Sequence, residues 1–278
     1  MGSREQAVCR RLCCAGGDAI MDLGLKDRVA FVAGSSRGIG KGIARAFLRE
    51  GCRTVITGRG AADLELAAAE LKSSAPEAEI LAVPGDMSDR DTVRAALKAT
   101  VDRWGSIDCV VANIGSGRSK PGWQLSRSDW DASFDLNLWP SVQLAAEALA
   151  VMTPAGKGSL VFIASITAVE STAAPMPYSA AKAALVNYAA NLARVAARDN
   201  IRVNCVAPGN ILFEGGSWER HLALRRGEVL DYIRAEVPQN RFGSVEEIAD
   251  VAVFLSSDRA AFVTGACWTV DGGQTRSS

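Results

Sequence analysis

The sequence predicts an α/β fold in which one doubly wound parallel sheet forms a single domain. Short apolar runs rich in Val, Ile and Ala alternate with helical stretches along the chain. A continuous apolar run is typical of a buried parallel strand, and regular alternation with helices requires right-handed crossovers. The run at 28–33 also leads into a glycine-rich turn and an amphipathic stretch at 39–48. Ligands of such sheets bind at the carboxyl ends of the strands.

Seven apolar runs are expected to form the strands. With 278 residues and 48% hydrophobic content, the chain is large enough for a sizeable core. No Pro/Ser-rich linker, charge run or internal repeat divides it, so residues 21–278 are interpreted as a single domain. The predicted strands are 28–33, 53–57, 79–83, 107–112, 158–164, 201–206 and 267–270.

Charge and composition argue against several classes of partner. The 31 basic and 31 acidic residues cancel, which leaves no electrostatic footprint for nucleic acid or an anionic membrane. No apolar stretch is long and uncharged enough to span a bilayer. We therefore expect a small-molecule partner and a cytoplasmic location, with Cys52, Cys109, Cys205 and Cys267 as small buried hydrophobes in a reducing compartment.

The first twenty residues differ from the rest of the chain. They contain three of the seven cysteines, but no histidine or second thiol cluster completes a zinc site. Their apolar content is too broken for a secretory signal. Residues 1–20 are predicted to be a disordered extension, with no metal site.

The glycine turn after the first run has the spacing Gly-x3-Gly-x-Gly, formed by Gly34, Gly38 and Gly40. A strand, a glycine-rich turn and a helix N-terminus predict a dinucleotide site, because backbone N–H groups and the helix dipole hold a pyrophosphate there. The commoner fingerprint is Gly-x-Gly-x2-Gly. A P-loop is excluded, because Lys41 is followed by Gly42 rather than by Ser or Thr.

The stretch Tyr178-Ser-Ala-Ala-Lys182 places a phenol and an amine on one helical face. Residues four apart in a helix are neighbours, and the alanine-rich flanks favour helix. A free phenol has a pKa of about 10, and a nearby ammonium lowers that pKa by stabilising the phenolate. The pair alone is equally compatible with a solvated helix surface, so its interpretation depends on the other motifs.

Together these motifs resemble the short-chain dehydrogenase/reductase family, in its single-domain branch with a Rossmann-like sheet. The resemblance runs in order from residue 23 to residue 274. Two departures, Ala33 for a threonine and Ile114 in the Asn-Asn-Ala-Gly segment, lose groups that brace the loops beside the cofactor in the family. The other matching positions are Gly34, Gly38, Gly40, Asn113, Gly115, Asn137, Ser165, Tyr178, Lys182, Pro208, Gly209 and 271–273.

The resemblance implies the roles of the catalytic residues. Tyr178 is expected to be the general acid/base, and Ser165 to hold the substrate oxygen. Lys182 is expected to lower the pKa of Tyr178 and to bind the nicotinamide ribose. Asn137 is expected to order a water for a proton relay. It falls in a predicted helix at 127–152, where Pro140 removes a hydrogen bond and kinks the chain.

The expected cofactor is NADP(H), with NAD(H) as the alternative. An NAD enzyme of this fold usually has an acidic residue after the second strand, whereas an NADP enzyme has an arginine for the 2′-phosphate. Here that strand ends at Arg59, with no carboxylate before Asp63, and Arg37 supplies a second cation. The complete set expected to bind cofactor is Gly34, Ser36, Arg37, Gly38, Ile39, Gly40, Arg59, Asp86, Met87, Asn113, Gly115, Tyr178, Lys182, Pro208, Gly209 and Ile211.

The expected reaction interconverts a ketone, for instance a 3-oxoacyl thioester, and a secondary alcohol by hydride transfer. A sugar or polyol dehydrogenase is one alternative, and a dinucleotide-sensing regulator without turnover is another. A serine hydrolase is disfavoured because Ser165 lacks the Gly-x-Ser-x-Gly elbow. Residues 210–236 are expected to form a substrate lid, and His221 to have no catalytic role. The resemblance also implies a homo-oligomer, a tetramer or a dimer.

Overall fold

The computed structural model describes residues 21–276, which contain one parallel sheet of seven strands in the order β3-β2-β1-β4-β5-β6-β7. The predicted tail at 1–20 lies outside the described residues. Every predicted strand is confirmed, with bounds shifted by at most two residues. The strands are β1 (Val29–Ala33), β2 (Arg53–Gly58), β3 (Ile80–Pro84), β4 (Cys109–Ala112), β5 (Gly158–Ile163), β6 (Ile201–Pro208) and β7 (Cys267–Val270).

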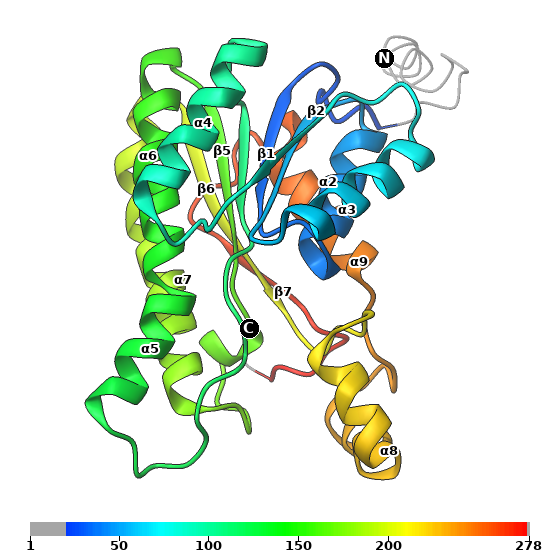
Figure 1. Ribbon diagram of the computed structural model, residues 1–278. Coiled ribbons are helices and arrows are strands. Elements are labelled where there is room, and N and C mark those ends of the chain that lie inside the picture. The colour runs from blue at the N-terminus through cyan, green and yellow to red at the C-terminus, as the bar shows by residue number, and fades with distance from the viewer. Residues whose placement is uncertain (1–20, 277–278) are drawn as a thin grey trace, which may run out of the picture.

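Helices cover both faces of this sheet (Figure 1). One layer contains α2 (Gly38–Arg49), α3 (Ala61–Ser74) and α9 (Val245–Ser256), and the other contains α4 (Arg90–Trp104), α6 (Trp139–Ala155) and α7 (Met176–Ala196). Two further helices, α5 (Arg127–Asn137) and α8 (Ser217–Glu236), extend beyond the sheet on opposite sides (Figure 1).

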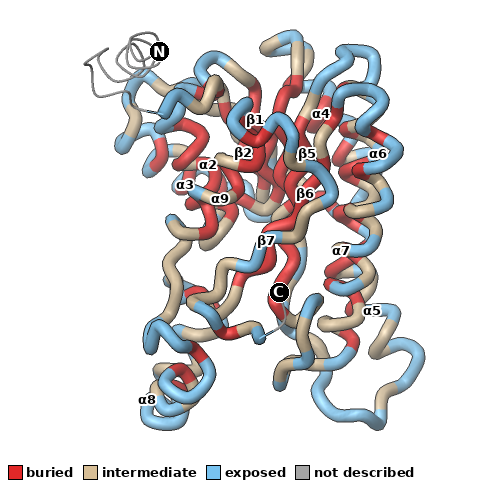
Figure 2. The backbone as a smooth tube through the Cα atoms, turned by 180° about the vertical axis from the view of Figure 1, so that it is seen from behind, coloured by how far each residue is buried: buried red, intermediate tan, exposed pale blue. Residues whose placement is uncertain are grey.

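The core consists of two apolar layers separated by the sheet. In β1, Phe31 and Ala33 pack into the layer with α4, α6 and α7, whereas Ala30 and Val32 pack into the layer with α2, α3 and α9. All five β1 residues are buried, because successive strand side chains point to opposite, helix-covered faces. Figure 2 shows this buried centre extending through the middle strands.

The predicted helix at 127–152 is in fact two helices. The chain breaks at Leu138 (φ −119°, ψ −63°), which ends α5 and begins α6. Pro140 therefore lies in the first turn of α6 rather than inside a helix, and a proline is tolerated there because first-turn N–H groups have no helical partner. As a result Asn137 is the last residue of α5.

The winding of the sheet reverses at β1, which pairs with β2 on one side and β4 on the other. In doubly wound sheets this switch point creates a crevice at the carboxyl ends of the strands. The helices α5 and α8 flank that end of the sheet (Figure 1). Across residues 21–276, no helix combines the length and apolarity needed to cross a membrane.

Candidate active site

The glycine turn after β1 is packed too closely for side chains. Gly34 has φ +65°, and a Cβ there would lie 2.3 Å from the carbonyl oxygen of Asn113. A Cβ on Gly40 would lie 2.2 Å from the carbonyl oxygen of Gly34. The turn thus brings the first turn of α2, and its free backbone N–H groups, to the end of β1. The predicted pyrophosphate site lies on this turn and stays a prediction.

Side chains from three segments brace this turn. Ser35 is fully buried, and its hydroxyl donates to the Val32 carbonyl (2.7 Å) and accepts from the Thr57 N–H (2.9 Å). The Thr57 hydroxyl accepts from the Gly34 N–H at 3.1 Å, and Asn113 Nδ2 donates to the Gly34 carbonyl at 2.8 Å. Ser35 and Thr57 thus supply polar bracing although Ala33 replaces the family's threonine. Neither residue was predicted from the sequence. The pattern that could have identified them is a hydroxyl residue within the glycine turn and another near the end of an apolar strand.

Tyr178 and Ser165 are brought together from two elements. Tyr178 lies in the first turn of α7, and Ser165 follows β5 as the residue that caps a short 3-10 helix (Ile166–Ala168). Burial raises the pKa of the Tyr178 phenol, and a hydrogen bond with Ser165 opposes that rise in part. A phenol with a raised pKa is protonated at neutral pH and is ready to donate a proton.

Lys182 is buried one turn further along α7, with 3% of its surface exposed. Its ammonium donates to the carbonyls of Ile163 (2.9 Å) and Ile114 (3.4 Å). Burial lowers the pKa of Lys182 to about 8, while the nearby Cys205 thiol acts in the opposite direction. The shift in the pKa of Tyr178 comes from burial and from Ser165, and the expectation that Lys182 lowers this pKa stays a prediction. The desolvation of the phenol dominates, and two carbonyls engage the ammonium.

Asn137 and Lys182 converge on Gly115. A Cβ on Gly115, which has φ +134°, would lie 2.6 Å from Asn137 Oδ1 and 3.3 Å from Lys182 Nζ. Asn137 is fully buried, with Oδ1 accepting from the Ser116 N–H at 2.8 Å and Nδ2 donating to the Ser133 carbonyl at 3.0 Å. The loop after β4 therefore joins the end of α5 to the Tyr-Lys helix, and only glycine fits between them.

The predicted adenosine side of the site lies at the ends of β2 and β3. A Cβ on Gly58 would lie 3.0 Å from Cβ of Ser36, so the glycine turn packs against the end of β2. Arg59 follows as an exposed cation near Asp86, and hydrogen bonds from Ser88 hold the pKa of that carboxyl below its usual value, with a smaller contribution from Arg59. Met87 is buried beside them.

The remaining predicted cofactor residues follow β6. A Cβ on Gly209 would lie 2.7 Å from Cβ of Asp271, so glycine is required where β6 passes the end of β7. Ile211 is 6% exposed and pairs with Gly243 in an isolated parallel bridge. Pro208, the last residue of β6, and Gly209 directly precede the segment predicted to be the lid, and Ile211 lies at its start.

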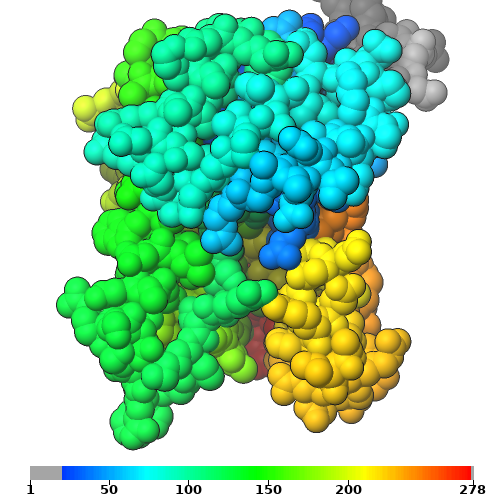
Figure 3. Space-filling view, viewed as in Figure 1, coloured from blue at the N-terminus to red at the C-terminus, as the bar shows by residue number. Residues whose placement is uncertain are grey.

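The segment at 210–236 contains α8, which is broken at Arg225 (φ −151°, ψ 57°). The Trp218 ring stacks on Tyr232 at 5.6 Å between ring centroids and contacts His221 edge-on at 5.5 Å. Tyr232 in turn accepts a hydrogen bond from Gln274 Nε2. His221 therefore packs within this segment. Figure 3 shows the hollow between the yellow α8 segment and the green segment that contains α5.

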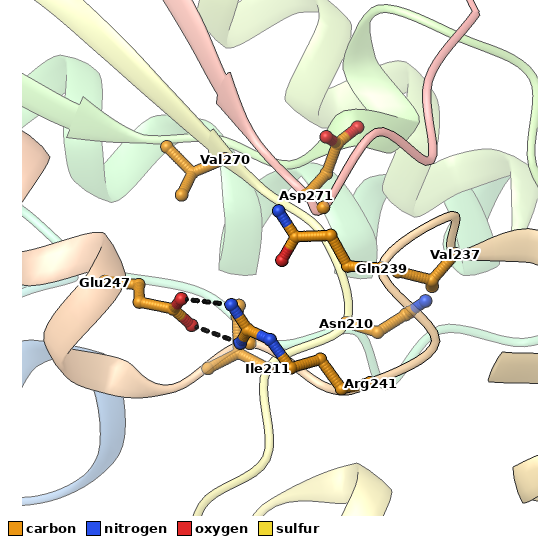
Figure 4. Close-up of a pocket in the computed structure, with 10 residues that line it drawn as sticks. Asn210, Ile211, Val237, Gln239, Arg241, Glu247, Val270 and Asp271 are labelled. Atoms are coloured by element: carbon orange, nitrogen blue, oxygen red, sulfur yellow. Dashed lines mark hydrogen bonds and ion pairs between the residues drawn. The ribbon is translucent and has the colours of Figure 1, made fainter. Parts of the chain in front are cut away.

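A separate cavity of about 100 Å³ lies between the ends of β6 and β7 and the start of α9 (Figure 4). Arg241 and Glu247 face each other in it through hydrogen bonds of 2.9 and 2.6 Å. Glu247 also accepts from the Ser244 N–H in a capping box that begins α9. Arg241, Glu247 and Ser244 thus satisfy one another's hydrogen-bonding groups. Within residues 21–276, no three His, Cys, Asp or Glu side chains form a candidate metal site.

Comparison with known proteins agrees with this geometry. Residues 33–275 match the family model described as Enoyl-(Acyl carrier protein) reductase. The chain is 32% identical to the 3-oxoacyl-[acyl-carrier-protein] reductase FabG of Chlamydia muridarum, over 90% of this chain and 98% of that protein. The chain belongs to the short-chain dehydrogenase/reductase family. It is also 34% identical to the gluconate 5-dehydrogenase of Gluconobacter oxydans, over 88% of this chain and 94% of that protein.

Solved structures of the family are equally similar. The L-sorbose reductase of Gluconobacter frateurii, in complex with NADPH and L-sorbose, superimposes with a TM-score of 0.87 and 32% identity, covering 93% of this chain and 100% of that one. These relatives are named dehydrogenases and reductases, and the match covers nearly the whole length of each. This member of the short-chain dehydrogenase/reductase family is therefore an oxidoreductase that acts on CH–OH groups with a nicotinamide cofactor.

Proposed function

We propose that the protein reduces a ketone to a secondary alcohol, and catalyses the reverse oxidation, with Tyr178 as the proton donor and acceptor. Ser165 holds the substrate oxygen beside the phenol. Lys182 holds the loop after β4 and the end of β5 through two carbonyls and offers its ammonium to the nicotinamide ribose. Asn137, buried at the end of α5, positions the loop at Gly115 and orders the water that returns the proton.

One observation carries this proposal. The Ser165–Tyr178 hydrogen bond places two hydroxyls at one point beyond the end of β5, one turn of α7 from a buried lysine. A ketone oxygen held between the two hydroxyls accepts a hydrogen bond from Ser165 and the proton from Tyr178. A pKa raised by burial favours the protonated phenol, which is the form that reduction requires.

The residues present fit NADP(H) as the cofactor. The reduced nicotinamide supplies the hydride when the cofactor is bound. The glycine turn and the start of α2 offer backbone N–H groups to the pyrophosphate, and Cβ atoms at Gly34 or Gly40 would collide with backbone atoms. Arg59 follows β2, where an NAD enzyme usually has an acid. Arg37 and Arg59 are both exposed cations at this end of the sheet, which suits a 2′-phosphate.

A substrate panel with the purified protein tests the proposal. NADPH oxidation is followed by absorbance with a 3-oxoacyl thioester, an apolar ketone and a keto sugar, with Tyr178→Phe as the inactive control. Turnover of the thioester or the apolar ketone supports the ketone reductase. Preference for the keto sugar favours the second candidate, a sugar or polyol dehydrogenase, which the similarity to L-sorbose reductase and gluconate 5-dehydrogenase supports.

A dinucleotide sensor without catalytic activity is the third candidate function, and a turnover assay distinguishes it from the two enzymes. A sensor needs the glycine turn, but it has no need of the Ser165, Tyr178, Lys182 and Asn137 cluster. Binding of NADPH without oxidation of any ketone, in wild type and Tyr178→Phe alike, would identify the protein as a sensor and overturn the catalytic proposal.

We further infer that the protein assembles as a homo-oligomer in the cytoplasm. The strand β7 forms one edge of the sheet, and it exposes Trp268 and Thr269. Phe262, just before β7, is fully exposed. An uncovered sheet edge with large apolar side chains is a typical interface between copies. Cys52, Cys109 and Cys205 are buried free thiols as expected, whereas Cys267, expected to be buried as well, is only half-buried. Free thiols are suited to a reducing compartment.

A further inference from the structure

Phe213 lies directly on the glycine turn. A Cβ built on Gly38 would be 2.6 Å from Cε2 of the Phe213 ring and 2.9 Å from its Cδ2. Gly38 is the first residue of α2, with φ +55°. The ring therefore covers the face of the turn where a side chain would otherwise project. It comes from the segment between β6 and α8, which is 175 residues further along the chain.

A second contact joins the same two segments. Nη1 of Arg37 lies 3.5 Å from the carbonyl oxygen of Gly215, which has φ +72°. The N–H of Gly215 donates to the carboxylate of Glu219 at 2.7 Å. Figure 3 shows the yellow atoms of this segment beside the blue atoms of the turn. Residues 213–215 are thus held on the glycine turn by an aromatic ring and by a cation.

The turn on which the ring packs is also the place where an anion is expected to bind. The N-cap residue of α2, Arg37, makes no side-chain capping bond, and the first turn of α2 contains no acidic residue. The N–H groups at this end are therefore available to a pyrophosphate. A phenyl ring offers no acceptor for them. The ring and a pyrophosphate cannot occupy the same face of Gly38, so one must move when the other is present.

We propose that Phe213, together with the Arg37–Gly215 contact, forms a latch that closes the pyrophosphate site and must open before a dinucleotide binds. The apparent affinity of the cofactor is then reduced by the fraction of molecules in which the latch is closed. A 2′-phosphate bound to Arg37 would take this side chain from Gly215, and one of the two contacts that hold the latch would be lost. This inference rests on the proposed function only in taking the ligand to be a nicotinamide dinucleotide.

The test measures binding rather than turnover, through the fluorescence of NADPH and NADH mixed rapidly with the protein. For the wild type, the observed association rate should level off with cofactor concentration at the opening rate of the latch. Phe213→Ala should remove this plateau and lower the Kd of both cofactors by about fivefold, because both share the pyrophosphate. Phe213→Leu, which keeps an apolar side chain in place, should give a smaller change in the same direction.

The matched control is Leu212→Ala, which shortens the neighbouring exposed side chain without uncovering Gly38. Its Kd values should equal those of the wild type. Arg37→Ala should tighten NADH, because a latch contact is lost, but weaken NADPH, because the 2′-phosphate partner is lost. Weaker binding of both cofactors to Phe213→Ala and Phe213→Leu would overturn the proposal and show that the ring stacks on the bound cofactor. Absence of any cofactor binding to the wild type would instead overturn the proposed function.

Discussion

At the residue scale, burial of Tyr178 and Lys182 sets the protonation states on which the chemistry depends. Burial raises the pKa of Tyr178 and lowers that of Lys182 to about 8, because each charged form loses hydration in the interior. Both shifts favour the neutral forms, which are a phenol that holds its proton and an amine that is more easily deprotonated. The site is therefore set for proton donation, and the oxidation of an alcohol should become faster as the pH rises towards the range in which the phenol ionises.

Tyr178→Phe should abolish turnover without abolishing cofactor binding. Only the titrating hydroxyl is removed, and the ring continues to fill its place in α7. Acid–base groups contribute about 10²- to 10⁴-fold to kcat. The measurement is kcat with the best substrate of the panel, together with the Kd of NADPH by fluorescence. Retention of more than about a tenth of the wild-type kcat would exclude Tyr178 as the proton donor.

Arg59→Ala should weaken NADP(H) far more than NAD(H). The guanidinium exchanges a phosphate for water, whereas the ribose of NAD(H) offers it only neutral hydroxyls. A charge-assisted contact of this kind changes KM by about 10- to 150-fold. Steady-state KM values for both cofactors decide the question, with Arg53→Ala as a control at the opposite end of β2. An equal effect on both cofactors, or a wild-type preference for NAD(H), would contradict the assignment.

At the element scale, the strands were predictable and the break before α6 was not. The five central strands are short, mostly apolar runs that are largely buried on both faces, and this signal depends only on local sequence. The residues at 127–152 are compatible with one kinked helix, so only tertiary packing reveals that the chain stops at Leu138. The break places Asn137 against Gly115, which lies in the loop after β4. The proposed catalytic residues could be predicted from their motifs. The carbonyl partners of Lys182 could not, because they come from the loop after β4 and from the end of β5, both distant in sequence.

Asp108 joins the beginnings of three strands. It is 6% exposed, and it accepts from the Val29 N–H of β1 at 2.9 Å and from the Ser106 hydroxyl at 3.2 Å. Its carboxylate also pairs with Lys157, just before β5, at 2.7 Å. Burial raises the pKa of Asp108, but the contacts with Lys157, Val29 and Ser106 outweigh burial and leave the pKa below its usual value.

Asp108→Asn should lower the free energy of unfolding by about 1.5 kcal/mol at neutral pH, since a bond to a charged group is lost. Because the folded pKa is depressed, the wild-type contribution is present above the unfolded pKa of about 3.9 and is lost as the pH falls through the folded value. Urea denaturation at pH 7 and pH 3 measures it, and the difference between the two proteins should shrink at the lower pH. Asp102→Asn, in an exposed pair with Lys98, is the matched control and should cost less than about 0.5 kcal/mol. Equal costs would show that the three-strand junction adds nothing.

At the scale of the whole molecule, the two edge strands of the sheet, β3 and β7, differ in exposure. The strand β3 at one edge is half-buried and ends in Pro84, which cannot donate to a further strand. The strand β7 at the other edge leaves Trp268 and Thr269 exposed, and Trp268 stacks on Phe254 of α9 with 5.7 Å between ring centroids. For the proposed homo-oligomer, this asymmetry favours β7 over β3 as the edge that a second copy covers.

Thr269→Arg should therefore shift the protein towards smaller species in sedimentation velocity. The substitution places a charge on the exposed edge without removing the Trp268–Phe254 stack, and facing copies around a twofold axis would bring two such charges together. Leu224→Arg, at an exposed leucine on α8, introduces the same charge away from β7 and should leave the wild-type distribution unchanged. Dissociation by Leu224→Arg alone would place the interface on α8. A wild-type protein that sediments as a monomer at all concentrations would contradict the assembly itself.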